Sequence, residues 1–198
     1  MSLELWNTFG TFGTFVVIGA TAIAALVQLR HARGSNQIAA LTQLMEASAT
    51  PQFSESERLI RTELASKLKD PEFRYQIANP AARTSENQGL IQKATDVGNF
   101  YENIGLLVRT GLVDRDLAVI ALSSQATGAW RMLAPVCAIV RPVQGEDVWE
   151  NLEFFVVLSQ DWIAAHPHGA YPAGVRRIVF KNEWLETDRQ YAASRASA

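Results

Sequence analysis

The stretch LIQKATDVGNFYENIGLLV, residues 90–108, decides the fold class, because its apolar residues recur at alternating spacings of four and three. On an α-helix such spacings place side chains on one face and give a continuous apolar seam. The seam consists of Leu90, Ala94, Val97, Tyr101, Ile104 and Val108. Gly111 then supplies a stop, since glycine accepts the left-handed conformation that follows many helices. The stretch predicts a long helix buried along one side.

The same period continues toward the C-terminus. Asp114 is an N-cap candidate for a helix that runs through Cys137 and that Pro135 should kink or shorten, and Pro142 with Gly145 should form the next break. The helix after that break has an apolar face and should end near residues 166–167. Its face consists of Val148, Leu152, Phe155, Val156, Ser159, Trp162 and Ile163.

The segments at the C-terminal end lack this period. Residues 167–182 are expected to form an ordered arm over the bundle, and residues 186–198 a disordered tail of small and polar residues. The candidate anchors of the arm are Val175, Ile178, Val179 and Phe180.

Toward the N-terminus, Thr50-Pro51 and Asp70-Pro71 each combine an N-cap residue with proline at the first helical position. The first pair begins a helix whose buried stripe is expected at Phe53, Ile60, Leu64 and Leu68. Residues 79–88 are polar and contain a proline, so they are expected to form a loop. The fold class is therefore all-α, with a bundle of five to six helices.

The first part of the chain carries a run without charge, LWNTFGTFGTFVVIGATAIAALVQL, from Leu5 to Leu29. As a helix it would be about 37 Å long, enough to cross a hydrocarbon core of about 30 Å. A cleaved signal peptide needs positive charge before its apolar core, whereas only Glu4 precedes this run. A buried core helix is the other alternative. We expect an uncleaved transmembrane helix that continues to about Ser48.

Orientation follows from Arg30 and Arg33, because basic residues beside a membrane segment stay in the cytoplasm. We expect a single-pass protein of the cell (inner) membrane, with its N-terminus outside and residues 30–185 as a cytoplasmic helical domain. All 18 basic residues follow Leu29, against 20 acidic residues in the chain, and none form a block of like charge. This balance argues against nucleic acid as a partner.

Glu102 is the candidate polar site. It lies between Gly98 and Gly105 on a stripe beside the apolar seam, where a second helix could approach closely. A half-buried carboxylate there needs a partner, and Arg131 and Arg109 are the candidates. Three interpretations are open: an ion pair that fixes helix register, a solvated surface glutamate, or a carboxylate for a ligand or metal.

The sequence gives little support for a metal site, a catalytic site or a cofactor-binding site. His166 and His168 flank a proline at a spacing that no standard metal site uses, and neither Glu150 nor Glu153 has a histidine three residues later. Motifs for a nucleophile elbow, a P-loop or a dinucleotide fold do not occur. No catalytic, metal or cofactor-binding residue is assigned, and the tryptophans at 130, 149 and 162 are expected in the core. Cys137 is expected to be an inert, buried thiol.

Three stretches, residues 16–41, 97–119 and 149–162, resemble an uncharacterised bacterial family of proteins with a domain of unknown function. That family has one N-terminal membrane helix and a cytosolic helical domain, so the resemblance implies a bacterial host and a membrane location, and no catalytic residue. We expect a membrane-anchored interaction or scaffold module, with the lipid bilayer and a protein partner or a second copy as partners. The alternative is a ligand-sensing or enzymatic domain with a pocket around Glu102.

Overall fold

The computed structural model describes residues 3–196, and the side chains of residues 3–17, 19, 33 and 196 lie outside that description. The described part is all-α and contains no strand, which confirms the predicted fold class. It divides into two compact units, Met1–Pro167 and His168–Ala198. The elements of the first unit are α1 (Leu3–Ser48), α2 (Pro51–Leu59), the π-helix η1 (Ile60–Leu64), α3 (Ala65–Lys67), α4 (Pro71–Ala78), the 3-10 helix η2 (Pro80–Ala82), α5 (Ser85–Arg109), α6 (Arg115–Gln144) and α7 (Glu150–Ala165).

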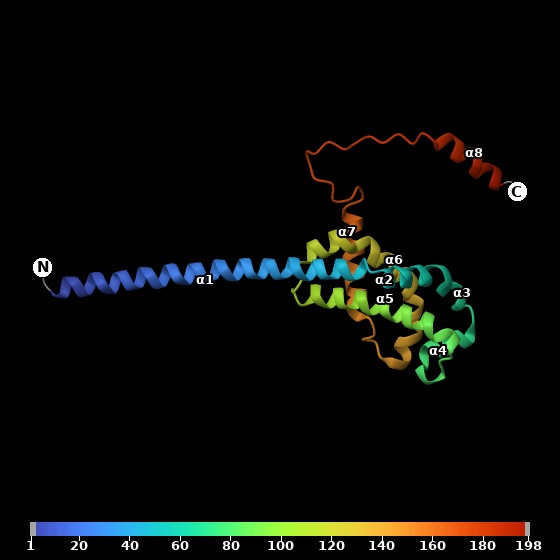
Figure 1. Cartoon of the computed structure of the whole chain (residues 1–198), viewed down its shortest axis with the longest axis horizontal. Helices are drawn as coiled ribbons and strands as arrows, with labels where there is room; N and C mark the ends of the chain where they lie inside the picture. The colour runs from blue at the N-terminus through green and yellow to red at the C-terminus, as the bar shows by residue number, and fades with distance from the viewer. Residues whose placement is uncertain (1–2, 197–198) are drawn as a thin grey trace. The chain divides into compact units, whose positions relative to one another are not determined.

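Helix α1 runs without a break to Ser48, as the sequence predicts (Figure 1). Its last turns belong to the helical domain, because Ala40, Leu41 and Leu44 pack against the core. The Gln37 side chain also donates a hydrogen bond to the carbonyl of Gly111, at 3.4 Å. The C-terminal end of α1 is thus held by the domain.

The predicted membrane span, residues 5–29, falls partly on residues 5–17, whose side chains lie outside the description. Among the residues that the structure describes, no helix is both long enough and apolar enough to cross a membrane. The span is therefore not confirmed. The described large apolar side chains between Ile18 and Leu29 are all exposed.

Helix α5 lies at the centre of the domain and packs on α7, α2 and α6. Its predicted seam is confirmed, since every one of the six seam residues is buried. Its predicted end is confirmed as well: Gly111 has φ of 71° and donates to Val108 O, while Leu112 donates to Leu107 O. These two bonds form a Schellman motif, which satisfies carbonyls at the end of the helix.

The predicted helix starts are also confirmed. The side chains of Thr50, Asp70 and Asp114 accept hydrogen bonds from the first-turn N–H groups of α2, α4 and α6. These bonds satisfy donors that a helix start leaves without partners. The stripe expected on the helix after Thr50 is buried at Ile60 and Leu64, which lie in η1.

Two predicted breaks occur, but their positions differ from those expected. Helix α5 begins at Ser85, inside the expected loop, because Thr84 takes an extended N-cap conformation and Glu86 stabilises the first turn. Of the polar residues there, Asn87 is buried and donates to Gln76 Oε1, whereas Thr84, Ser85 and Glu86 are exposed. Helix α6 continues past Pro135 and Pro142 to Gln144, and Gly145, with φ of 121°, ends it. Pro135 therefore does not shorten the helix.

The second unit, His168–Ala198, also differs from expectation. The residues proposed as anchors of an arm are exposed, with Val179 at 92 % and Phe180 at 87 % exposed, so their expected burial is not observed. Helix α8 (Leu185–Ala196) occupies most of the segment expected to be a disordered tail. Residues 197–198 lie outside the described part.

Candidate functional site

Glu102 holds the start of helix α7. Trp149 occupies the N-cap position of α7 and gives it no side-chain cap. The Glu102 carboxylate, coming from α5, accepts a hydrogen bond from Leu152 N at 2.8 Å and one from Asn151 Nδ2 at 2.6 Å. A carboxylate at a helix N-terminus is stabilised by the unpaired N–H groups and the helix dipole. Glu102 therefore supplies from a neighbouring helix the cap that α7 lacks.

Of the three interpretations of Glu102, the ion pair with Arg109 or Arg131 is not observed among the described residues. Among the described residues, no salt bridge involves Glu102, and its partners are the backbone and an amide. Arg109 instead donates to Glu150 Oε1 at 3.0 Å and to Asn151 Oδ1 at 3.2 Å, so it joins α5 to the same end of α7. Arg131 is exposed on α6. Glu102 therefore fixes the packing of α5 on α7 without pairing with an arginine.

The two glycines that flank Glu102 permit this contact. A Cβ atom on Gly98 would overlap the Trp149 ring, and one on Gly105 would overlap the backbone carbonyl of Asn151. The stripe predicted from the sequence is therefore the surface on which the start of α7 rests. Arg141 secures the same junction from α6, with Nη2 at 2.7 Å from Glu153 Oε2 and Nε donating to Val148 O at 3.0 Å.

Trp149 has an unusual backbone conformation. Its φ and ψ are 55° and 34°, in the left-handed region that bulky residues rarely occupy. Such a conformation costs on the order of 1–3 kcal/mol and persists when the surroundings fix it. The indole is 8 % exposed, and its Nε1–H donates to Asn99 Oδ1 at 3.1 Å. This conformation directs the indole from the α6–α7 connection toward α5.

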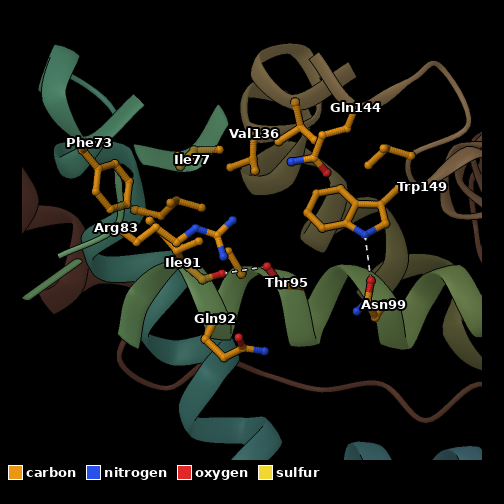
Figure 2. Close-up of a pocket in the computed structure, with 14 residues that line it drawn as sticks. Phe73, Ile77, Arg83, Ile91, Gln92, Thr95, Asn99, Val136, Gln144 and Trp149 are labelled. Atoms are coloured by element: carbon orange, nitrogen blue, oxygen red, sulfur yellow. Dashed lines mark hydrogen bonds between the residues drawn. The ribbon is translucent and has the colours of Figure 1, made fainter. Parts of the chain in front are cut away.

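The indole forms one wall of a cavity of about 190 Å³, which lies between α4, α5 and α6 (Figure 2). We name it the Trp149 cavity. Its apolar lining is provided by Leu64, Phe73, Ile77, Ile91, Ala94, Val136, Val140 and Val148. Its polar lining is provided by Arg83, Gln92, Thr95, Asn99 and Gln144.

The polar side chains that line the cavity differ in how many hydrogen bonds they already make within the protein. The Thr95 hydroxyl donates to Ile91 O at 2.9 Å, and Gln92 donates to Asp96 at 2.7 Å. Arg83 is held only through Nε, which donates to the backbone carbonyl of Gln76 at 3.3 Å. Figure 2 shows the Arg83 guanidinium and the Gln144 amide pointing into the space between Ile77 and Trp149. These two side chains therefore present donors to the cavity.

A buried polar network fixes the base of Arg83. The Gln76 side chain is 1 % exposed, and its Oε1 accepts hydrogen bonds from Thr84 N, Thr84 Oγ1 and Asn87 Nδ2 at 3.1–3.3 Å. Asn87 in turn accepts from Lys67 Nζ at 3.1 Å. This network joins α4 to the start of α5 and orders the short connection that carries Arg83.

The lining can bind but offers little for catalysis. Of the described residues that line the cavity, none is a carboxylate, a histidine, a serine or a cysteine. Cys137 lies nearby in α6, where burial raises the pKa of its thiol, as expected for an inert residue. Within the described part of the chain, no three His, Cys, Asp or Glu side chains gather as a metal ion would require.

The family model described as "Domain of unknown function (DUF4760)" matches residues 15–157. The chain belongs to this family. The DUF4760 match includes Glu102, Trp149 and every residue that lines the Trp149 cavity. No curated protein and no solved structure matches the chain.

Sequence reasoning found part of this DUF4760 site. It singled out Glu102 with its flanking glycines, and it expected Trp149 in the core. It missed Arg83, Gln76 and Asn99, because Arg83 lies in a stretch expected to be a loop and the other two are polar residues on helices. The sequence also led us to expect a pocket around Glu102. Glu102 does not line the cavity, which instead has Trp149 as one wall.

Proposed function

We propose that this chain is a membrane-tethered helical module, in which α1 is the anchor and the α2–α7 domain binds a partner at the membrane surface. One observation supports the tether most directly: the described apolar side chains between residues 18 and 29 are exposed on α1. Ile23 is 65 % exposed and Leu29 is 67 % exposed. A helix that is apolar all round needs an apolar environment, and a lipid bilayer supplies one.

The sequence supports the same proposal. Residues 5–29 carry no charge, and Arg30 and Arg33 follow them. Basic residues beside an anchor remain in the cytoplasm, so the proposed orientation has the N-terminus outside and the helical domain inside the cell membrane. A cytoplasmic domain with a single buried thiol is consistent with a reducing compartment.

Carbonate extraction and a fusion reporter test the tether. Membranes containing the full chain should retain it in carbonate, and a reporter active only in the cytoplasm should be active when fused after Ala198. Replacing both Ile18 and Ala20, which lie near the middle of the proposed span, with arginine should release the protein, because each charge there costs about 2.5–3.5 kcal/mol. A full-length protein that carbonate extracts would rule out the anchor.

The partner of the tethered domain is proposed to be a protein or a second copy of the chain. Cross-linking of membranes that contain the full chain tests self-association, since two joined copies of 21.8 kDa migrate together at twice that mass. Cross-linked products of other masses would indicate a different protein. A domain that stays monomeric and gains no partner in its native membrane would contradict an interaction module.

A second candidate function is ligand sensing, and the Trp149 cavity favours it. The cavity has an apolar interior, few polar groups and a wall residue in a strained conformation, which are features of small-molecule sites. Its polar groups do not include a pair suited to acid–base chemistry, so binding is favoured over catalysis.

A further inference from the structure

We propose that the Trp149 cavity binds a small organic anion, a carboxylate attached to a compact apolar body. The proposal deepens the ligand-sensing function and does not depend on the membrane tether. It has three parts: the charge of the cavity, its shape and size, and the way its wall is held.

The positive charge of Arg83 in the cavity favours binding of an anion. Among the described residues that line the cavity, Arg83 alone is charged. Its Nε is engaged with Gln76 O, and the structure gives its two terminal nitrogens no hydrogen bond among the described residues. A guanidinium with free Nη groups presents a fork that matches the two oxygens of a carboxylate. Gln144 adds an amide on the opposite side of the same space (Figure 2).

The apolar interior of the cavity favours a ligand whose uncharged part is small and apolar. Phe73, Ile77 and Ile91 are almost completely buried and form the floor near Arg83, while Trp149 closes the other end. The volume is about 190 Å³. An apolar protein cavity of about 150 Å³ accepts a benzene molecule. The Trp149 cavity therefore fits a phenyl-sized or branched aliphatic group together with its carboxylate.

The wall is preorganised. The Trp149 ring rests on Gly98, where any Cβ would overlap it, and Asn99 accepts the indole N–H. A ligand that enters would meet an aromatic face already in place, so little ordering would oppose binding.

Phenylacetate and phenylacetamide are the probes that test this proposal, because they share a body and differ in charge. Binding to the full chain in lipid nanodiscs would be followed by ligand-observed NMR, with empty nanodiscs subtracted. We expect phenylacetate to bind at least tenfold more tightly than phenylacetamide. Replacing Arg83 with glutamine should remove that preference, whereas Arg131→Gln, at an exposed arginine outside the cavity, should leave it intact.

A second variant tests the location. Val140→Phe places a ring in the cavity, so it should abolish binding of both probes while circular dichroism shows a retained cooperative melt. Equal affinity for acid and amide, or a preference that survives Arg83→Gln, would overturn the anion proposal and leave a neutral ligand site. Failure of both probes to bind would overturn the anion proposal and the ligand-sensing function together, without bearing on the tether.

Discussion

Glu102 shows how one side chain can join two helices without an ion pair. Its two oxygens receive one backbone N–H and one amide N–H from the start of α7. In Glu102→Gln, the single amide oxygen can keep only one of these bonds, and its NH₂ group would face another donor. The free energy of unfolding should fall by about 1–3 kcal/mol, as for other lost bonds to a charged group.

Chemical denaturation of the full chain in a membrane mimic measures that fall. Glu63→Gln is the matched control, because Glu63 is exposed in η1 and its side chain makes no hydrogen bond or salt bridge with any described residue. It should change the stability by less than about 0.5 kcal/mol. Equal stabilities of the two variants would mean that the cap on α7 is supplied by solvent.

Tyr101 gives the domain a dependence on alkaline pH. Burial is the main reason why the pKa of its phenol is raised, and the Glu57 carboxylate, which accepts its hydrogen bond at 3.1 Å, adds to the effect. The folded state thus favours the neutral phenol. Its stabilising contribution is complete below the unfolded pKa of about 10 and is lost as pH rises above it, by at most about 1.4 kcal/mol per pH unit.

Thermal melts between pH 9 and 11.5 check this expectation. The natural protein should lose stability across that interval more steeply than Tyr101→Phe, although the variant is less stable at pH 9 because it lacks the bond to Glu57. Tyr75 is exposed and serves as the control position for Tyr→Phe. Parallel curves for all three proteins would contradict a buried, neutral Tyr101.

At the scale of elements, the packing of α7 on α5 depends on two glycines of the same helix. Gly105→Ala would place a Cβ against the backbone carbonyl of Asn151, which cannot rotate away. We expect it to destabilise the domain by about 1–3 kcal/mol. Gly89→Ala lies on the same helix in open space and should instead stabilise it by roughly 0.5–1 kcal/mol. Melting temperatures that move in the same direction would refute this account.

The elements also show what the sequence could predict. The seam of α5, the caps at Thr50, Asp70 and Asp114 and the stop at Gly111 depend on neighbours within one or two helical turns, and all were predicted. The partner of Glu102 lies about fifty positions along the chain, and no local pattern indicates which helix end it meets. Residues 85–88 were misassigned for a related reason, because the residue that binds Asn87 at this helix start is the buried Gln76 of another helix.

At the scale of the whole chain, the proposed tether and the domain share α1. The described large apolar side chains from Ile18 to Leu29 are exposed, whereas Ala40, Leu41 and Leu44 pack against the core of the domain. The sequence placed the boundary of the domain at residue 30, inside a helix that the structure shows to be continuous. A continuous helix transmits any rotation or tilt of its N-terminal end to the domain more directly than a flexible linker would.

This arrangement predicts where the chain can be cut. A protein of residues 35–198 should be soluble and show a cooperative, mainly helical melt, because it keeps every residue of α1 that packs on the core. A protein of residues 50–198 should be less stable by roughly 2–3 kcal/mol, since two half-buried leucines and the Gln37 bond to Gly111 are removed. Circular dichroism of both proteins decides the matter. Equal melts would show that residues 35–49 add no stability to the domain, and a non-cooperative melt of residues 35–198 would show that the domain needs the first part of α1 to fold.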